Sequence, residues 1–139
     1  MMRIATVSIV AFLSASNAFG ADLSHCWSGN TLEINECMAA VLDKAEKDMV
    51  VAYESTLKQI SQTPYSRGSE PQNEKLRTDV SRLMVESQNE WLKFRKADCA
   101  VVYQDSSTGS VRNMIHLQCL IARTEQRTID LRKWRAWQY

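Results

Sequence analysis

The residues of this chain best suited to chemistry are its cysteines and histidines. The cysteines are Cys26, Cys37, Cys99 and Cys119. His25 directly precedes the first of them, and His116 lies three residues before the last. Thiolates and imidazoles at such spacings can bind zinc, and a thiolate beside an imidazole can act as a nucleophile. Both kinds of site need reduced thiols, so the compartment in which the protein works decides whether they can form.

The first twenty residues have the pattern of a signal peptide. Arg3 precedes an apolar run over residues 4–13, which is too short to span a bilayer. Ala18 and Gly20 place small side chains at the −3 and −1 positions of a signal peptidase site, so we expect cleavage after Gly20, with Ala18 as the alternative. No cysteine follows at once to carry a lipid, and no later apolar run is long enough to cross a membrane. We therefore expect residues 21–139 to form a periplasmic or secreted protein.

An even number of cysteines in an exported chain normally forms disulfides. Three pairings are possible. We favour Cys26 with Cys37 and Cys99 with Cys119, because each pair closes a short loop and is worth about 3 kcal/mol in the chain-entropy model. Paired thiols cannot ligate or attack, so we predict no metal site, no cofactor and no catalytic residue. The two histidines are interpreted as partly exposed helix or loop residues.

The charge balance argues against nucleic acid as a partner. The whole chain has a formal charge of +1, and residues 1–20 contain one basic residue, Arg3, and no acidic one, so the mature chain is neutral. A nucleic-acid binder would show a clear positive excess. The chain also lacks a Gly-rich phosphate loop, a Gly-x-Ser-x-Gly elbow and a nucleotide-binding fingerprint. We therefore predict a single domain that is not an enzyme.

Three long helices account for the apolar pattern of the mature chain. Apolar residues recur at three- and four-residue steps within 31–62, 70–103 and 111–135. The breaks between these segments are 63–71, which holds both prolines, and the polar run 105–110. We predict an all-α, elongated up-down-up bundle of three long helices stapled by two disulfides. The first helix would be about 45 Å long, so the two ends of the bundle are chemically separate.

Cap residues support two of the predicted helix starts. Asn30 is followed three residues later by Glu33, which is typical of a helix N-cap. Ser69 and Gln72 have the same spacing, and Pro71 between them is tolerated in a first helical turn.

The second predicted helix carries an aromatic and cationic group that allows two interpretations. Arg95 lies one turn after Trp91, so its guanidinium can stack on the indole, and Asp98 lies three residues further on. The apolar stripe of this helix consists of Leu76, Val80, Leu83, Met84, Trp91, Phe94 and Val102. We favour a core with a buttressing ion pair over a ligand site, because apolar side chains at helical spacing usually face the core.

Several motifs recur in a known order along the chain: Thr31-x-Glu33-x-Asn35-x-Cys37, Gln88-x-x-Trp91-x-x-Phe94-Arg95-x-x-x-Cys99, Cys119-Leu120 and Thr124-x-x-Arg127. This order resembles the LprI-like lysozyme-inhibitor domain family over nearly the whole mature chain. The resemblance implies a small exported helical domain with four paired cysteines and a protein partner, such as a lysozyme or other wall hydrolase. The family motif residues are Gln88, Trp91, Phe94, Arg95, Thr124 and Arg127. At Glu46, Met49 and Val50 the chain departs from the family, which usually shows an Asp followed by Leu-Asn there.

The leading functional hypothesis is an exported binding protein that blocks the cleft of a lysozyme-type peptidoglycan hydrolase. The alternative is a structural or assembly factor of the envelope, or an immunity-type partner of another periplasmic protein. Co-purification from the periplasm separates them, because the captured partner is a muramidase in the first case and something else in the second.

For the partner-binding surface we favour the end of the bundle where the loop 63–71 meets the C-terminus. The residues gathered there are Tyr65, Arg67, Trp134, Arg135, Trp137 and Tyr139. Tyr, Trp and Arg dominate binding hot spots, which is why this end is preferred. One alternative is the polar loop 105–110 at the cysteine end, which is better preorganised. The other is that the tryptophans only seal the end of the core.

Overall fold

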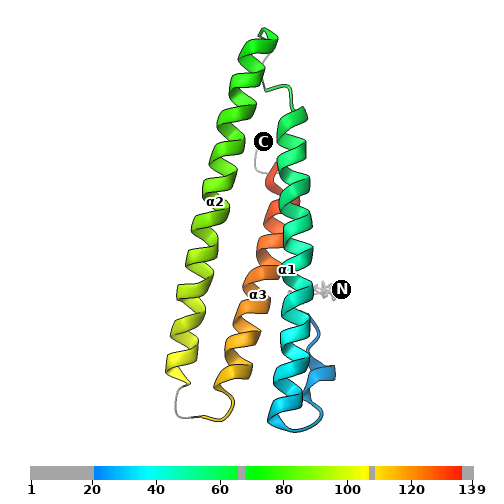
Figure 1. The fold of residues 1–139 in the computed structure, drawn as a ribbon, viewed down its shortest axis with the longest axis vertical. Helices are drawn as coiled ribbons and strands as arrows, with labels where there is room; N and C mark the ends of the chain where they lie inside the picture. Colours follow the sequence, from blue (N-terminus) through cyan, green and yellow to red (C-terminus); the bar gives the residue numbers. More distant parts are fainter. Residues whose placement is uncertain (1–20, 66–67, 107–108, 136–139) are drawn as a thin grey trace, which may run out of the picture.

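The computed structural model describes residues 21–65, 68–106 and 109–135. Its elements are η1 (Ser24–Trp27, a short 3-10 helix), α1 (Thr31–Gln62), α2 (Glu70–Asp105) and α3 (Arg112–Arg132). The three long helices run up, down and up along one axis (Figure 1). The described ranges contain no strand, and the predicted all-α elongated bundle is confirmed. The predicted signal peptide, residues 1–20, lies outside the described residues.

The observed helix bounds are close to those expected from the sequence. α1 has the predicted bounds, and α2 ends at Asp105 rather than at residue 103. α3 begins one residue later than expected and ends at Arg132, three residues earlier than expected. The polar run after α2 and the two prolines before it therefore separate the helices as the sequence indicates.

The cap residues explain where the first two helices begin. Asn30 Oδ1 accepts hydrogen bonds from the backbone N–H groups of Leu32 and Glu33, at 3.0 and 3.2 Å. Glu33 Oε2 in turn accepts from the Asn30 N–H at 2.8 Å, which completes a reciprocal capping box. At the start of α2, Gln72 Oε1 accepts from the Ser69 N–H at 3.1 Å. These bonds satisfy backbone donors that a helix start otherwise leaves unpaired.

α3 is the central packing element of the bundle. It lies between α1 and α2 and packs against both, whereas α1 and α2 contact each other least (Figure 1). One core cluster lies at the end where η1 joins α1; its buried members are Leu23, Cys26, Ile34, Met38, Met114 and Ile121. A second cluster lies further along α1 and consists of Met49, Ala52 and Leu131. The core thus follows the interface between α1 and α3.

α2 buries less apolar surface than its sequence pattern predicts. Its buried residues are Asn73, Gln88 and Cys99, and two of these are polar. Leu76, Leu83 and Phe94 of the predicted stripe are exposed, at 39%, 54% and 52%. The prediction that they face the core is wrong, because α3 ends well before the start of α2 and touches α2 along only one side (Figure 1).

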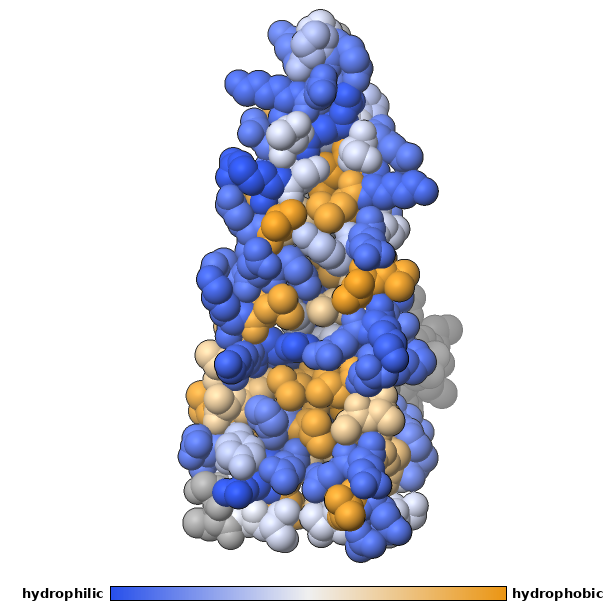
Figure 2. All heavy atoms as spheres, in the orientation of Figure 1, coloured by the Kyte–Doolittle hydropathy of each residue, from blue (hydrophilic) through white to orange (hydrophobic). Residues whose placement is uncertain are grey.

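The surface of the bundle is mixed in polarity. Figure 2 shows apolar side chains along the middle of one face, interrupted by a hydrophilic band. Near the α1–α2 loop an open hollow of about 370 Å³ is lined by polar groups, namely Ser61, Glu74, Arg77, Thr78 and Ser81. Across the described part of the chain, each helix is too polar or too short to cross a membrane.

Candidate functional site

All four cysteines form disulfides in the favoured pairing. Cys26 bonds to Cys37 and Cys99 to Cys119, with Cα atoms 5.5 and 5.7 Å apart. The sulfur atoms therefore provide no thiolate for metal binding or for attack. The first bridge ties η1 to α1, and the second ties the end of α2 to the start of α3.

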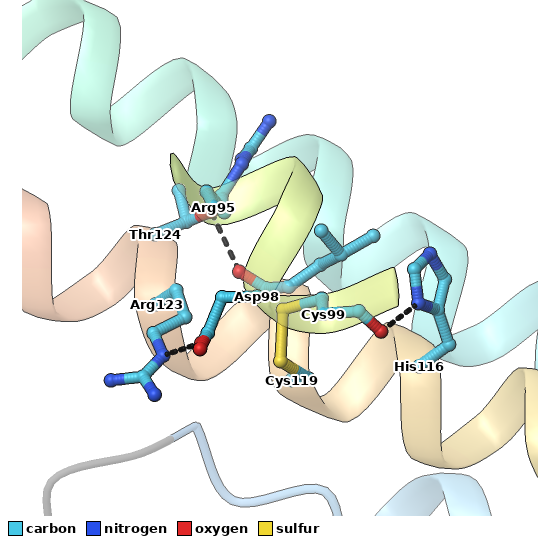
Figure 3. The surroundings of a disulfide bond; sticks show 8 residues. Arg95, Asp98, Cys99, His116, Cys119, Arg123 and Thr124 are labelled. Carbon is cyan, nitrogen blue, oxygen red and sulfur yellow. Dashed lines mark hydrogen bonds and ion pairs between the residues drawn. A yellow bond between two sulfur atoms is a disulfide. The ribbon is translucent and has the colours of Figure 1, made fainter. Parts of the chain in front are cut away.

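Both histidines lie beside these bridges and bond to backbone carbonyl oxygens. The His116 ring donates through Nδ1 to the Cys99 carbonyl oxygen at 3.0 Å (Figure 3). Because a carbonyl oxygen only accepts, the proton of this imidazole is on Nδ1. His25 Nδ1 lies 2.9 Å from the Asp22 carbonyl oxygen. Each imidazole thus has a structural partner at the edge of a disulfide.

Trp91 lies at the centre of the family motif residues. The Arg95 guanidinium carbon is 5.3 Å from the centroid of the indole ring, and that of Arg127 is 5.8 Å from it. Both distances are within the range of a cation–π interaction. The stacking of Arg95 on Trp91 predicted from their spacing is confirmed, and Arg127 from α3 adds a second cation that the sequence pattern did not indicate.

Arg95 joins all three helices. Its Nη1 donates to Thr124 Oγ1 of α3 at 2.6 Å, and its Nη2 pairs with Glu46 Oε1 of α1 at 2.8 Å. The Arg95 side chain is only 14% exposed. Thr124 is fully buried and donates its own hydroxyl to the Leu120 carbonyl oxygen at 2.7 Å. Through these bonds, Arg95 of α2 fixes the positions of α1 and α3 relative to each other.

The ion pair of Arg95 differs from the one expected. Asp98 pairs with Arg123 Nε at 2.8 Å instead of with Arg95. Figure 3 shows the reason: the Arg95 guanidinium points away from the Asp98 carboxylate, which faces Arg123. Three-residue spacing brings two side chains near each other, but packing between helices decides which partners they reach.

Arg127 has a different set of partners. Its Nε donates to Gln88 Oε1 at 3.0 Å, and its Nη2 donates to Ser87 Oγ at 3.2 Å. The Gln88 amide then donates to Met49 Sδ of α1 at 3.5 Å. Burial lowers the pKa of Arg127, and the Asp130 carboxylate opposes that shift. Because the ordinary pKa of arginine is so high, the guanidinium stays charged.

These contacts define the Trp91 cluster, which consists of Glu46, Gln88, Trp91, Arg95, Thr124 and Arg127. Phe94, the remaining family motif residue, lies outside it. Its ring is exposed, and the Arg123 guanidinium carbon lies 5.9 Å from the ring centroid. The polar groups of the cluster point at one another, so its chemistry is that of a fastening between helices.

Glu46 is the member of the cluster that the sequence interpretation missed. The other charges around it form pairs one turn apart, Lys44 with Asp48 and Lys47 with Asp43. Glu46 is thus left without a partner on its own helix. The absence of a basic residue one turn away from Glu46 could have indicated that its partner lies on another helix.

The residues proposed for partner binding lie partly within the described ranges. Tyr65 and Trp134 are partly buried, and Tyr65 Oη and Trp134 Nε1 are buried without a hydrogen-bond partner. The Arg135 guanidinium carbon lies 5.7 Å from the Trp134 ring centroid. Arg67, Trp137 and Tyr139 lie outside the described residues. The use of this end for binding stays a prediction.

The fold and the cluster define an all-α bundle domain in which two disulfides and a partly buried cluster of arginine and tryptophan side chains hold the helices together. More specifically, the chain belongs to the family described as Lysozyme inhibitor LprI, which it matches over residues 26–131. The matched range contains all four cysteines and all six family motif residues. The resemblance found in the motifs is therefore confirmed at the level of the family.

The chain is also similar to a distant relative among curated proteins. The chain is 24% identical over 123 residues to "Uncharacterized protein YecT" of Escherichia coli (strain K12), covering 81% of this chain and 73% of that protein. No solved structure matches this chain.

Proposed function

We propose that this protein is exported and inhibits a lysozyme-type peptidoglycan hydrolase by binding it. The observation that carries this proposal is membership of the Lysozyme inhibitor LprI family over residues 26–131. The match spans all three long helices and both disulfides, so it involves the domain as a whole.

The arrangement of the polar groups supports binding rather than catalysis. The cysteines are oxidised, and both cations of the Trp91 cluster bond to protein groups, although the buried Arg95 Nε has no hydrogen-bond partner among the described residues. An inhibitor that blocks a cleft needs a rigid surface and no reacting groups of its own. Two disulfides and a fastened bundle reduce the entropy lost when such a surface binds.

Export is part of the proposal, because peptidoglycan lies outside the cytoplasm. The apolar segment 4–13 with the small residues before Ala21 supports a cleaved signal peptide. Two disulfides in so small a domain are typical of an oxidising compartment. Intact mass of the protein recovered from the periplasm or the medium tests this step, with a chain beginning at Ala21 as the expected result.

The test of inhibition uses residues 21–139 folded under oxidising conditions and a C-type lysozyme acting on a peptidoglycan suspension. We expect clearing of the suspension to slow with increasing protein and to stop at a molar excess. Reduced and alkylated protein is the control and should not inhibit. Absence of inhibition across C-type, G-type and bacterial muramidases would reject the proposal. Capture of an unrelated envelope protein instead would favour the assembly or immunity alternative.

A further inference from the structure

The two disulfides rigidify the same end of the bundle. This end, called the stapled end below, comprises η1 with the turn 28–30, the first turns of α1, the last turns of α2 and the first turns of α3 (Figure 1). Gly29 adopts φ +115° in the turn, and the capping box of Asn30 fixes the residues that follow. Arg112 stacks over the Tyr103 ring at 5.1 Å, and Tyr103 meets His116 edge to face at 5.4 Å. The disulfides, the capping box and these ring contacts together rigidify the backbone of the stapled end.

Large apolar side chains remain exposed on this rigid backbone. Trp27 is 51% exposed, Leu32 65%, Val101 68% and Val111 42%. They come from η1, α1, α2 and the residue before α3, so all the elements of the end contribute. Burying such side chains against a partner would be favourable, and in the described part of the chain these four stay largely exposed to solvent. Tryptophan is enriched among the hot spots of protein interfaces, and Trp27 lies on η1, which the first disulfide preorganises.

The charges of the molecule are unevenly distributed along its axis, although residues 21–139 together are neutral. The exposed acidic residues of the stapled end are Glu33, Glu36 and Asp105, with Asp22 just before η1, and its exposed Arg or Lys residue is Arg112. Asp98, further along α2, is already paired with Arg123. The Ser24 N–H donates to Asp22 Oδ1 at 2.9 Å, and hydrogen bonding by Ser24 lowers the pKa of that carboxyl.

The opposite end is nearly balanced. Its described basic residues are Lys58, Lys75, Arg77, Arg82, Arg132, Lys133 and Arg135. Its described acidic residues are Glu54, Glu70, Glu74, Asp79, Glu86 and Asp130, and Glu86 pairs with Arg82. A neutral total therefore conceals an excess of acidic groups at the stapled end, which attracts a basic partner more strongly than the opposite end does.

We propose that the stapled end is the surface that binds the hydrolase, with Trp27 as its apolar anchor and the surrounding carboxylates facing a basic muramidase. This inference rests on the proposed function and adds the location and charge of its binding surface. Many lysozymes are basic, so acidic groups around an apolar anchor attract and orient such a partner. Trp27 lay outside the sequence-based candidates, which assigned the aromatic anchor to the opposite end.

The experiment measures the dissociation constant for a C-type lysozyme and the inhibition of its activity, using the mature protein and two sets of variants. Trp27→Ala and Leu32→Ala remove exposed apolar groups of the stapled end, and Glu36→Lys with Asp105→Lys reverses its charge. Leu83→Ala, an exposed leucine on α2, is the matched apolar control. Lys58→Glu with Lys133→Glu reverses charge at the opposite end as the matched electrostatic control. The melting temperature of each variant is measured in parallel.

We expect Trp27→Ala to weaken binding by about 30-fold or more, the size of a hot-spot loss. The charge reversal at the stapled end should weaken it about tenfold, and both controls should stay within about twofold. Native melting temperatures are expected throughout, because the changed side chains are exposed. If Trp27→Ala and Leu32→Ala bind like the unmodified protein, the stapled end is not the interface. Loss of binding in the Lys58→Glu, Lys133→Glu control would place the interface at the opposite end. If the unmodified protein binds no muramidase, the proposed function itself fails and this inference with it.

Discussion

Two guanidinium groups approach the Trp91 ring, and they are compensated differently. Arg95 forms an ion pair with Glu46, whereas Arg127 hydrogen-bonds to the neutral oxygens of Gln88 and Ser87, lies over the indole face and interacts with the Asp130 carboxylate only at longer range. A partly buried cation is costly unless its N–H groups are bonded. The chief role of Gln88 and Trp91 is therefore to offset the free-energy cost of partly burying the Arg127 guanidinium.

Arg95→Ala should lower the free energy of unfolding by about 2 to 4 kcal/mol, because it removes the contacts of one guanidinium to two helices and leaves the buried Thr124 hydroxyl without its donor. The contribution of Glu46 is the smaller part, since its carboxylate is 43% exposed and screened by water. Urea unfolding gives the value. Arg82→Ala, which breaks the exposed pair with Glu86 on the same helix, is the control and should cost under about 0.5 kcal/mol.

An Arg95→Ala protein that melts like the unmodified chain but no longer inhibits would contradict this structural role. It would show instead that the Trp91 cluster contacts the partner.

At the residue scale, contacts within one helix were predictable and contacts between helices were not. The stacking of Arg95 on Trp91 follows from a four-residue spacing, which any helix brings together. The pairing of Arg95 with Glu46 depends on how α1 and α2 are rotated toward each other, and that is set by the packing of α3 between them. Phe94 shows the same limit, because its spacing suits a core residue while its ring is exposed, with Arg123 of α3 beside it.

At the scale of elements, the disulfides and the turn before α1 have different roles. The Cys99–Cys119 bridge joins two helices that also share the Trp91 cluster. The Cys26–Cys37 bridge instead holds η1, whose other described attachment is the packing of Leu23 and Cys26 in the core cluster. Loss of the Cys26–Cys37 bridge should therefore loosen the stapled end more than the rest of the bundle.

Replacing either pair of cysteines with serine should cost about 2 to 5 kcal/mol of unfolding free energy, the usual loss for a small exported domain. For Cys26→Ser with Cys37→Ser, we also expect faster hydrogen exchange in η1 while the middle of α2 stays protected. Mass spectrometry after alkylation without reduction should find no labelled cysteine in the unmodified protein. A labelled cysteine in the unmodified protein would contradict the two disulfides. Equal loss of protection in η1 and in the middle of α2 of the variant would contradict the local role of the Cys26–Cys37 bridge.

Gly29 is the glycine whose conformation the fold requires. Its φ of +115° is unfavourable for any other residue, and a Cβ there would meet the Glu33 side chain of the capping box. We expect Gly29→Ala to destabilise the protein by about 1 to 3 kcal/mol. Gly109→Ala is the matched control, because a Cβ at Gly109 has its nearest neighbour at 3.6 Å. Thermal melts of the two variants compare them, and equal melting temperatures would show that the turn tolerates a side chain.

Helix positions could be predicted better than helix surroundings. Asn30 and Ser69 carry their capping partners three residues ahead in the sequence, so the starts of α1 and α2 were visible as local patterns. The exposure of Leu76 and Leu83 was not, because an apolar stripe does not reveal which side of α2 the other helices cover. The favoured disulfide pairing was correct because each bridge closes a short loop.

At the scale of the whole molecule, net charge and charge distribution lead to opposite expectations for binding. The neutrality of residues 21–139 as a whole argues against electrostatic attraction to a basic lysozyme. The structure places an excess of exposed acidic groups at the stapled end and a near balance of charges at the other, about one helix length away. At that separation salt screens the far end from the near one, so a partner meets the local charge.

This separation leads to a prediction about salt. If an acidic stapled end binds a basic muramidase, raising the ionic strength from about 0.05 to about 0.5 M should lower the association rate constant at least about tenfold. The dissociation rate constant should change much less, because apolar contacts centred on Trp27 hold the complex once it has formed. Surface plasmon resonance with immobilised lysozyme measures both rate constants. The Glu36→Lys, Asp105→Lys variant should lose most of the salt dependence, while Lys58→Glu, Lys133→Glu should retain it. A salt dependence that persists in the first variant and vanishes in the second would place the binding charge at the opposite end and contradict an acidic interface.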